Sequence, residues 1–450
     1  MNMNLFKYIL ALIAISLVAF SCEKKTPDEI VSETYNGLVI NEIAAHDELS
    51  DIASWVEILN TSSKEVSLAG LGLYLKDSYL NDKCVWSTDT GSLPAGGRLV
   101  VSSADDSGLS TGIISNEEFV LRLGTKDGSV DKFIRSKYMP EKQFNRGSYQ
   151  RIPDGSAEWR NMPYNSKGRE NEVFDWHKPL PNAIWMWSTH MTPLLENDAA
   201  IMKEYWEKGY RHLLLHCNAF LNRDWEAKVF MDKAEEIGFT VHGWILAFSN
   251  GSTWNYPIDK ETQTIKEEVF AEIINKGKVC IEGFGVKGLH LDYIRFGGSA
   301  EKYNFTKEVN SVAVVNRACR EVRELCDSYN AGLVTSAALM PEKNSERYYA
   351  QTPSLMGKYI HILMPMCYRY SYNLSDEGIV NLMNWFCSNS ADAEVWSGLT
   401  TYDKSTVGLT EEVLLQDIMA YRQSNATGIV LFRHGLGTFP DVNNIWNTTD

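Results

Sequence analysis

Eight apolar segments of strand length recur between residues 182 and 434, and helical stretches such as DWEAKVFMDKAEEIG lie between them. Eight strand-and-helix units in about 260 residues meet the requirement of a (β/α)8 barrel. A doubly wound open sheet is the alternative, but no glycine-rich phosphate loop follows the first segment. The sequence therefore predicts an α/β (β/α)8 TIM barrel over residues 171–450. The predicted strands lie at 182–190, 210–218, 240–248, 288–296, 333–341, 360–368, 394–401 and 428–434.

Residues 36–170 have a different pattern, made of short runs in which apolar and polar residues alternate. The runs include GLVINEIAA, SWVEILNTS, LGLYLKD, GRLVVSS and EFVLRLG, and turn-forming stretches such as LPAGG and KDGS separate them. Short strands at this spacing, without a helical stretch, indicate an antiparallel β-sandwich. The chain is thus expected to be multidomain, with an all-β domain before the barrel.

A resemblance refines this expectation for the first domain. VINEIAA, SWVEILNTSSKEVSLAGLGLYL, LPAGGRLVV and SYQRIPDGSAEW follow one another in the order found in the lamin-tail domain. The resemblance implies an immunoglobulin-like sandwich, which in exported bacterial proteins looks like an accessory module of hydrolases. Glu42, Asp51 and Glu57 could form a calcium cluster, but the sequence favours solvent-facing positions on half-buried strands.

The first 21 residues carry one lysine, a short apolar run and small residues before Cys22. This pattern predicts a secretory signal peptide that is too short for a spanning helix. LVAFSC resembles a bacterial lipobox, which implies that Cys22 carries a lipid; ordinary signal cleavage beside an incidental cysteine is the alternative. Residues 22–35 form a polar tether. We therefore expect a lipid-anchored protein of the cell envelope, with the side of the membrane left open.

The charge of the chain excludes one class of partner. The formal net charge is −15 at pH 7. Nucleic-acid binding needs a basic surface patch, so no nucleic-acid partner is expected.

The barrel sequence contains a carboxylate inside an apolar strand, in GLHLDYIRF. Asp292 lies near the end of this strand, and active sites of such barrels lie at the carboxyl ends of the strands. His290 has the same parity and should lie one layer deeper, where it could hydrogen-bond the carboxylate. Arg295 has the opposite parity and reaches the mouth only if the strand ends by Tyr293. A second acid, Glu342, follows the next predicted strand in SAALMPEKN.

Two carboxyl groups at neighbouring strand ends are the minimum requirement for glycoside hydrolysis. One group protonates the leaving oxygen, and the other attacks or stabilises the oxocarbenium-like centre. Neighbouring strands lie about 4.8 Å apart, which favours the short separation of a retaining enzyme. A structural role as a loop cap or ion-pair partner remains open for each acid, and more so for Glu342.

The barrel also resembles a family. GLHLDYIRF, VTSAALMPE, YYAQTP and ILMPMCYRY occur in the order found in the glycoside hydrolases with family-10-like barrels. The resemblance implies that Asp292 is the nucleophile and Glu342 the general acid/base. Relatives carry Gln-Asp where this chain has Gln351-Thr352; loss of that acid could weaken catalysis.

Other residues at the predicted mouth suit a sugar ligand, because aromatic faces stack on sugar rings while polar side chains bond hydroxyl groups. For each aromatic residue, core packing is an equal alternative. The predicted substrate-binding residues are His290, Tyr293, Arg295, His216, Asn218, Trp244, Tyr368, Trp396, Arg433 and His434.

No metal or other cofactor is expected. His212 and His216 share one face of a strand but lie about 13 Å apart along it, which is too far to bind one ion. No HExxH motif occurs.

Two functions compete with the glycosidase: a glycan-binding protein with a degenerate barrel, and an envelope interaction module that uses the first domain.

Overall fold

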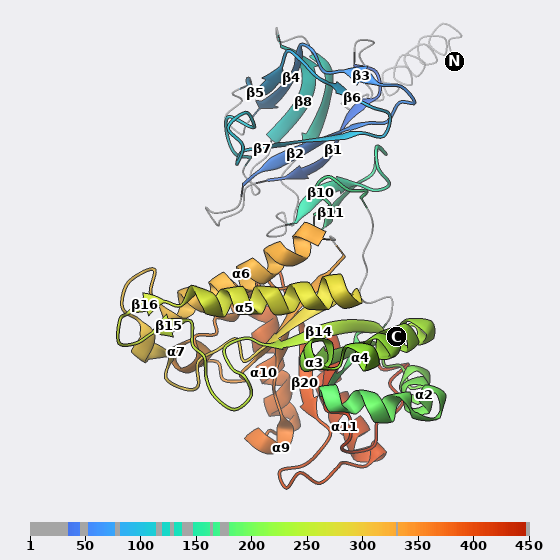
Figure 1. Ribbon diagram of the computed structural model, residues 1–450, viewed down its shortest axis with the longest axis vertical. Helices are drawn as coiled ribbons and strands as arrows, with labels where there is room; N and C mark the ends of the chain where they lie inside the picture. The colour runs from blue at the N-terminus through green and yellow to red at the C-terminus, as the bar shows by residue number, and fades with distance from the viewer. Residues whose placement is uncertain are drawn as a thin grey trace, which may run out of the picture. The chain divides into compact units, whose positions relative to one another are not determined.

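The computed structural model describes residues 35–45, 53–76, 82–113, 119–126, 130–136, 147–162, 165–171, 180–329 and 332–446. The predicted signal peptide and Cys22 lie outside these residues. The chain forms two compact units (Figure 1). Unit 1 is Met1–Gln143, Gly147–Met162 and Lys167–Glu172, and unit 2 is Phe144–Arg146, Pro163–Ser166 and Val173–Asp450.

Unit 1 contains two antiparallel sheets and a two-stranded ribbon. One sheet has the order β11-β10-β1-β2-β7, the second has the order β5-β4-β8-β9, and the ribbon pairs β3 with β6. The strands are β1 Leu38–Ala44, β2 Trp55–Asn60, β3 Val66–Ser67, β4 Leu71–Lys76, β5 Asp82–Thr88, β6 Ser92–Leu93, β7 Arg98–Ser102, β8 Phe119–Thr125, β9 Val130–Ser136, β10 Ser148–Arg151 and β11 Trp159–Met162.

The two sheets of unit 1 share one hydrophobic core. Val56 and Ile58 of β2 belong to the same buried cluster as Leu73 of β4 and Leu121 of β8. Alternate residues of both sheets thus point inward, as in a sandwich. The antiparallel architecture is confirmed, whereas the immunoglobulin-like and lamin-tail assignments stay predictions.

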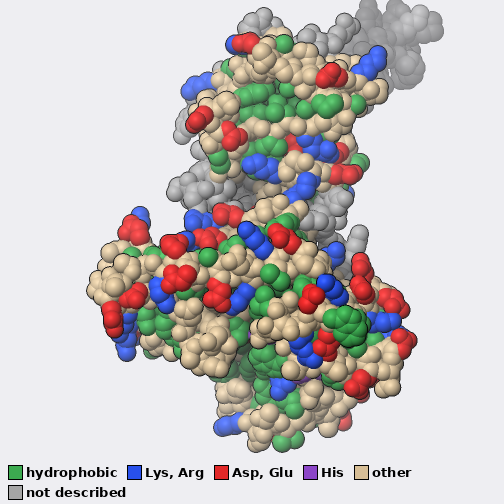
Figure 2. Space-filling model, viewed as in Figure 1, with side chains coloured by type: hydrophobic (Ala, Val, Ile, Leu, Met, Phe, Trp, Pro, Cys, Tyr) green, Lys and Arg blue, Asp and Glu red, His purple; other side chains and the backbone are tan. Residues whose placement is uncertain are grey.

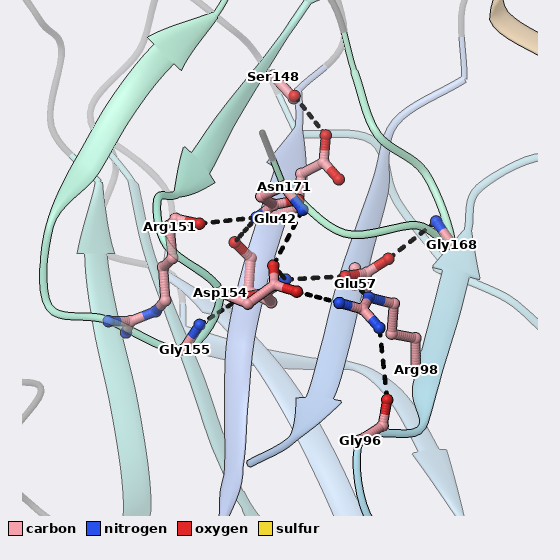
Figure 3. Close-up of polar contacts among 11 residues, drawn as sticks. Glu42, Glu57, Gly96, Arg98, Ser148, Arg151, Asp154, Gly155, Gly168 and Asn171 are labelled. Atoms are coloured by element: carbon pink, nitrogen blue, oxygen red, sulfur yellow. Dashed lines mark hydrogen bonds and ion pairs between the residues drawn. The ribbon is translucent and has the colours of Figure 1, made fainter. Parts of the chain in front are cut away.

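A buried polar network occupies the outer side of the β1–β2 pair (Figure 3). Glu42 and Glu57 are opposite each other in the ladder, and both are fully buried. Glu57 accepts hydrogen bonds from Asn41 Nδ2 at 3.0 Å and from the backbone N–H of Gly168 at 2.8 Å. The prediction that Glu42 and Glu57 face solvent is therefore wrong. Asp51, the third acid of the calcium alternative, lies outside the described residues.

The network covers this side of the sheet because it binds a later part of the chain. Arg98 lies 3.4 Å from Glu57 Oε1 and forms an ion pair with Asp154. Asp154 also accepts a hydrogen bond at 3.1 Å from the N–H of Asn171, whose side chain donates to the carbonyl of Arg151 at 3.0 Å. Glu57 and Asp154 thus bind the backbone of Gly168 and Asn171, which also belong to unit 1.

Unit 2 contains a closed barrel of eight parallel strands in chain order. Each predicted strand contains one of them, so the predicted barrel is confirmed. Apolar residues point to both sides because the barrel interior and the surrounding helices bury both faces of each strand. The barrel strands are β12 Asn182–Met186, β13 His212–His216, β14 Thr240–Leu246, β17 Gly288–Asp292, β18 Val334–Leu339, β19 Ile362–Pro365, β20 Glu394–Thr400 and β21 Gly428–Phe432.

Long helices surround the barrel, and short elements follow the carboxyl ends of several strands (Figure 1). The long helices are α2 Met191–Glu207, α4 Asp224–Ile237, α5 Glu267–Lys278, α6 Ser311–Tyr329, α10 Asp376–Ser388 and α11 Glu411–Arg422. The short elements are η2 Ser188–His190, α3 Asn218–Asn222, the β15 Ile258–Asp259 and β16 Thr264–Ile265 pair, η3 Val279–Gly283, η4 Ala300–Tyr303, α7 Ser345–Tyr349, α8 Pro353–Met356 and α9 Arg369–Tyr372. Most of these extra elements follow strand ends, so they build the mouth of the barrel.

The surface and the helices bear on the expected partners. On the face of the barrel unit shown in Figure 2, Lys and Arg side chains are interspersed with Asp and Glu side chains. Among the described helices, none is both long and apolar enough to cross a bilayer.

Candidate active site at the barrel mouth

The strand that carries Asp292 ends at this residue. Tyr293 adopts a left-handed backbone conformation with φ of 51°, which an aromatic residue rarely adopts and which terminates the ladder. The condition that the sequence set for Arg295 is thus met, since strand parity no longer applies beyond Tyr293. Arg295 lies against the rings of residues around the mouth.

Asp292 is a buried carboxylate that has two hydrogen-bond donors. Its side chain is only 9% exposed. Oδ1 accepts a hydrogen bond from the N–H of Tyr293 at 2.6 Å, and Oδ2 accepts one from Trp244 Nε1 at 3.2 Å. Burial raises the pKa of Asp292, while the Tyr293 N–H, the charge of Arg295 and the Trp244 donor lower it, and burial outweighs them.

His290 lies below Asp292 as expected, but it does not support the carboxylate directly. Its Nε2 accepts a hydrogen bond from Trp185 Nε1 at 3.0 Å, and its Nδ1 lies 2.9 Å from Ser336 Oγ. The ring is fully buried, so the expected bond to Asp292 and the expected contact with substrate are both wrong. The deeper layer contains other polar partners, and these occupy both ring nitrogens.

Glu342 lies in the loop between β18 and α7, next to the strand end that carries Asp292. Its Oε1 accepts a hydrogen bond from the hydroxyl of Tyr349 at 3.2 Å. Its Oε2 is buried and has no hydrogen-bond partner among the described residues. A buried carboxyl oxygen without a partner is costly, which favours a role in binding or proton transfer.

Gln351 connects the two loops that carry the acids. Its Oε1 accepts a hydrogen bond from the N–H of Met340 at 2.8 Å. Its Nε2 donates to the carbonyl of Ala338 at 3.0 Å and to that of Ile294 at 3.3 Å. Gln351 therefore fixes the end of β18 against the segment that follows Asp292.

Thr352 follows Gln351 and is bonded to a different acid. Its hydroxyl donates to Glu346 Oε2 at 2.8 Å. In this chain Glu342 is instead bonded by Tyr349. Thr352 thus does not bond Glu342, whose partner is the hydroxyl of Tyr349.

Arg295 lies among aromatic rings. Its guanidinium carbon is 5.0 Å from the ring centres of Trp254 and Tyr293 and 5.7 Å from that of Tyr349. Its Nε is buried without a hydrogen-bond partner among the described residues. Within the same residues, no carboxylate lies within ion-pair distance of it.

Aromatic rings form another part of the mouth. Trp187, which follows β12, has its ring centre 4.6 Å from that of Trp244 and 5.2 Å from that of His216. Phe432 at the end of β21 stacks on Tyr368 at 6.1 Å. Burial lowers the pKa of His216 to about 4, so the ring is neutral at pH 7. Its buried Nε2 has no partner among the described residues.

A basic cluster lies at the end of β21. Arg433 Nη1 is 3.3 Å from Nε2 of His190, and His434 Nδ1 is 2.8 Å from the hydroxyl of Tyr205. Burial, together with the charge of Arg433, lowers the pKa of His434 to about 4. Arg433 therefore carries the positive charge of this cluster at pH 7.

The placement of Trp396 at the mouth is wrong. Trp396 pairs with Gly428, the first residue of β21, so it lies near the opposite end of the barrel. It is 1% exposed and packs against His212, the first residue of β13. The strand continues to Thr400, and the predicted segment alone did not show which of its residues reach the mouth.

Asn218, a predicted substrate ligand, is exposed at the start of α3, and its N–H donates to Nδ1 of His216 at 3.3 Å.

The structure also brings to the mouth residues that the sequence interpretation left out. Tyr349, Phe432 and His190 contact Glu342, Tyr368 and Arg433 but were not among the predicted ligands. Phe432 and His190 lie inside the predicted strands at 428–434 and 182–190, whereas Tyr349 lies in α7, beyond the predicted strand at 333–341. Phe432 ends the barrel strand β21, while His190 and Tyr349 are contributed by the short elements η2 and α7, whose course the strand pattern does not determine.

No family model matches the chain, and no curated protein sequence is similar to it. Several solved structures are similar at low identity. The glycoside hydrolase domain of PgaB (BpsB) from Bordetella bronchiseptica is 9% identical, with 56% of this chain and 94% of that chain covered and a TM-score of 0.43. A chitinase from Rhizomucor miehei is 12% identical over 56% of this chain and 94% of its own, with a TM-score of 0.38. A β-glucuronidase 2 variant from Bacteroides uniformis is 8% identical, with 88% of this chain and 46% of that chain covered and a TM-score of 0.38. These similarities are too weak to bear on substrate or mechanism.

Proposed function

We propose that unit 2 is a glycoside hydrolase that cleaves a poly- or oligosaccharide. One observation carries the proposal. A buried carboxylate with two hydrogen-bond donors, Asp292, ends one strand, and a second carboxyl group with a free buried oxygen, Glu342, follows the neighbouring strand. Paired carboxyl groups in different surroundings are the arrangement that glycoside hydrolysis requires.

The residues have distinct roles in this proposal. Ionised Asp292 attacks the anomeric carbon, and Glu342 Oε2 donates its proton to the leaving oxygen. Glu342 then removes a proton from the water that releases the sugar, which gives net retention. The Tyr293 N–H and Trp244 Nε1 fix the Asp292 carboxylate, while Trp187, Tyr368 and Phe432 offer faces for sugar rings.

The test is the release of reducing ends by residues 23–450 from a panel of bacterial, plant and host glycans. Wild type, Asp292→Asn and Glu342→Gln are compared on the same panel. Turnover by the wild type that both substitutions abolish supports the proposal. Turnover that survives Asp292→Asn contradicts the assigned nucleophile. The anomeric form of the first product, read by NMR, tests retention.

A glycan-binding protein without turnover is the second candidate function. The small exposed fraction of Asp292 favours it, because a nucleophile must reach the anomeric carbon. This alternative predicts saturable glycan binding that survives Asp292→Asn and no product over time.

The proposal also includes a lipid anchor at Cys22, supported by the lipobox-like LVAFSC sequence. The full-length protein should then fractionate with membranes and incorporate labelled palmitate, and Cys22→Ser should lose both properties. Palmitate labelling that persists in Cys22→Ser would contradict this site.

A further inference from the structure

Arg295 is a half-buried cation whose hydrogen-bonding groups are nearly all unused. The nearest bond is a marginal one of 3.5 Å from Nη1 to the carbonyl of Phe296. Its Nε is buried without a partner among the described residues. A guanidinium has five N–H donors in a rigid fork, so most of this fork remains available to a ligand.

Other arginines of unit 2 differ from Arg295 in this respect. Arg317 binds Glu267 at 2.5 Å, Arg347 binds Glu301 at 2.9 Å, and Arg369 binds Asp417 at 2.9 Å. These arginines have their counter-ions within the protein. In the described part of the chain, Arg295 has no carboxylate within ion-pair distance, although its charge lowers the pKa of Asp292.

Three aromatic rings lie close to the guanidinium of Arg295. The rings of Trp254, Tyr293 and Tyr349 lie within 6 Å of the guanidinium and restrict its movement. Aromatic rings attract the charge of a guanidinium and accept none of its N–H groups in ordinary hydrogen bonds, so these donors stay available to an acceptor. The hydroxyl of Tyr349 also binds Glu342, so these donors lie in the same site as the proposed acid/base.

A second cation without a carboxylate partner lies across the mouth. Arg433 follows β21, the eighth strand of the closed barrel, while Arg295 follows β17, the fourth, and such strands are opposite each other. Asp292 and Glu342 alone would repel a negatively charged glycan. The two arginines offset this repulsion, and Arg295 does so next to the acids.

We infer that the saccharide bound at this mouth is acidic and that the guanidinium of Arg295 binds its carboxylate or sulfate group. The inference rests on the proposed function for its location and adds the class of substrate. A guanidinium held among aromatic rings binds a carboxylate through two parallel charge-assisted hydrogen bonds, a geometry that a neutral hydroxyl cannot match. Arg295 is thus a specificity-determining residue.

The experiment measures binding and turnover separately, with residues 23–450 as wild type, Arg295→Met, Arg295→Lys and the control Arg347→Met. Arg347 is exposed and already paired, so its removal deletes the same charge without opening the site. The probes are oligogalacturonates, hyaluronan oligosaccharides, their carboxyl-reduced neutral forms, sulfated carrageenan oligosaccharides and neutral cello- and xylo-oligosaccharides. Calorimetric binding is measured on each.

We expect at least one acidic probe to bind wild type and Arg347→Met alike. Removing the acidic group from that probe should weaken binding to the wild type about tenfold or more, and Arg295→Met should weaken binding of the acidic probe by a similar factor. The two changes combined should weaken binding no more than either one alone. The sulfated probes distinguish sulfate from carboxylate. Arg295→Lys should recover only part of the loss, because lysine lacks the fork.

Three outcomes separate the possible failures. Equal binding of neutral probes by wild type and Arg295→Met, with no acidic probe bound, overturns the inference. Cleavage of a neutral glycan that Arg295→Met leaves unchanged overturns it while leaving the hydrolase intact. Binding of an acidic probe that depends on Arg295, with no cleavage of any probe, supports the inference and contradicts the proposed hydrolase function. Arg295→Met should also unfold at or above the wild-type temperature, whereas marked destabilisation would show that Arg295 serves the fold.

Discussion

At the scale of single residues, the chemistry of the site depends on how Asp292 keeps its charge. Burial raises the pKa of Asp292, while the Tyr293 N–H, the charge of Arg295 and the Trp244 donor lower it. The pKa of Asp292 is nevertheless raised from its ordinary value. Activity that needs ionised Asp292 should therefore fall on the acidic side at a higher pH than for an exposed aspartate.

Trp244→Phe should shift this acidic limb to still higher pH. The substitution removes a donor that stabilises only the ionised carboxylate, so the pKa of Asp292 should rise by about one unit. The measurement is the pH dependence of kcat/KM. Trp225→Phe is the control, because Trp225 is 77% exposed on α4. An acidic limb that does not move in Trp244→Phe would show that the bond to Asp292 has no effect on catalysis.

Tyr293 stores strain beside the proposed nucleophile. Its φ of 51° is unfavourable for any residue with a side chain but not for glycine. We therefore expect Tyr293→Gly to be more stable than Tyr293→Ala by about 1 kcal/mol, although both lack the ring beside Arg295. The free energy of unfolding in denaturant gives the comparison. A less stable glycine variant would contradict the strained conformation.

At the scale of elements, the site depends on how neighbouring loops are joined. The two proposed catalytic acids lie after β17 and β18, and the side chain of Gln351 bonds both segments. The relative position of the acids is therefore determined by a residue that bonds backbone atoms and contacts neither carboxylate. Such a positioning residue should affect turnover more than substrate affinity.

Gln351→Leu should lower kcat by about tenfold or more with a smaller change in KM, because a small misplacement of the acids slows the reaction. It should also cost about 2–4 kcal/mol of stability, since the N–H of Met340 and the carbonyl of Ile294 lose a buried partner. Steady-state kinetics and chemical unfolding measure these effects. The neighbouring Thr352→Ala loses only an exposed bond and should match wild type. Equal losses in both variants would contradict the role of Gln351.

The sequence predicts some of these elements well, and the physical reasons are specific. The eight strands of the barrel are long apolar runs, so periodicity finds them. Asp292 stands out because it is a carboxylate in such a run. An apolar residue such as Trp396 fits either end of a barrel strand, so the sequence could not predict at which end of the barrel it lies.

The failures share a cause in contacts between distant parts of the chain. Glu42 and Glu57 have the alternation of exposed strand positions, but Ser148 and Gly168, far along the chain, donate hydrogen bonds to their carboxylates. Tyr349 lies in the short helix α7, and its approach to Glu342 and Arg295 follows from the course of that loop. Local sequence carries no signal for such contacts.

At the scale of the whole molecule, the chain consists of two units that each have their own core. The acids of unit 1 serve its fold, because they bind Arg98, Asn41 and the backbone N–H groups of Gly168 and Asn171 (Figure 3). The proposed catalysis lies entirely in unit 2. Destabilisation of unit 1 should therefore leave turnover by unit 2 unchanged.

Arg98→Met should destabilise unit 1 by about 3 kcal/mol at pH 7, because it leaves buried Glu57 without its counter-ion. Burial already raises the pKa of Glu57 from its ordinary value of 4.5, so burying the ionised carboxylate costs stability at pH 7. This cost disappears as the pH falls and Glu57 is protonated. The loss should therefore be smaller near pH 4 than at pH 7. Scanning calorimetry at both pH values tests this, with turnover as the control. A loss that grows on acidification would contradict the burial of an ionised Glu57.

The most direct test of the central claim measures binding and turnover together, on one glycan, for wild type and Asp292→Asn. If Asp292 is the nucleophile of a glycosidase, the substitution should retain binding within a few-fold while turnover falls by about a thousandfold or more. Turnover by Asp292→Asn at the wild-type rate would contradict the role of Asp292 as nucleophile. Binding of the glycan by the wild type without any product would contradict the glycosidase function.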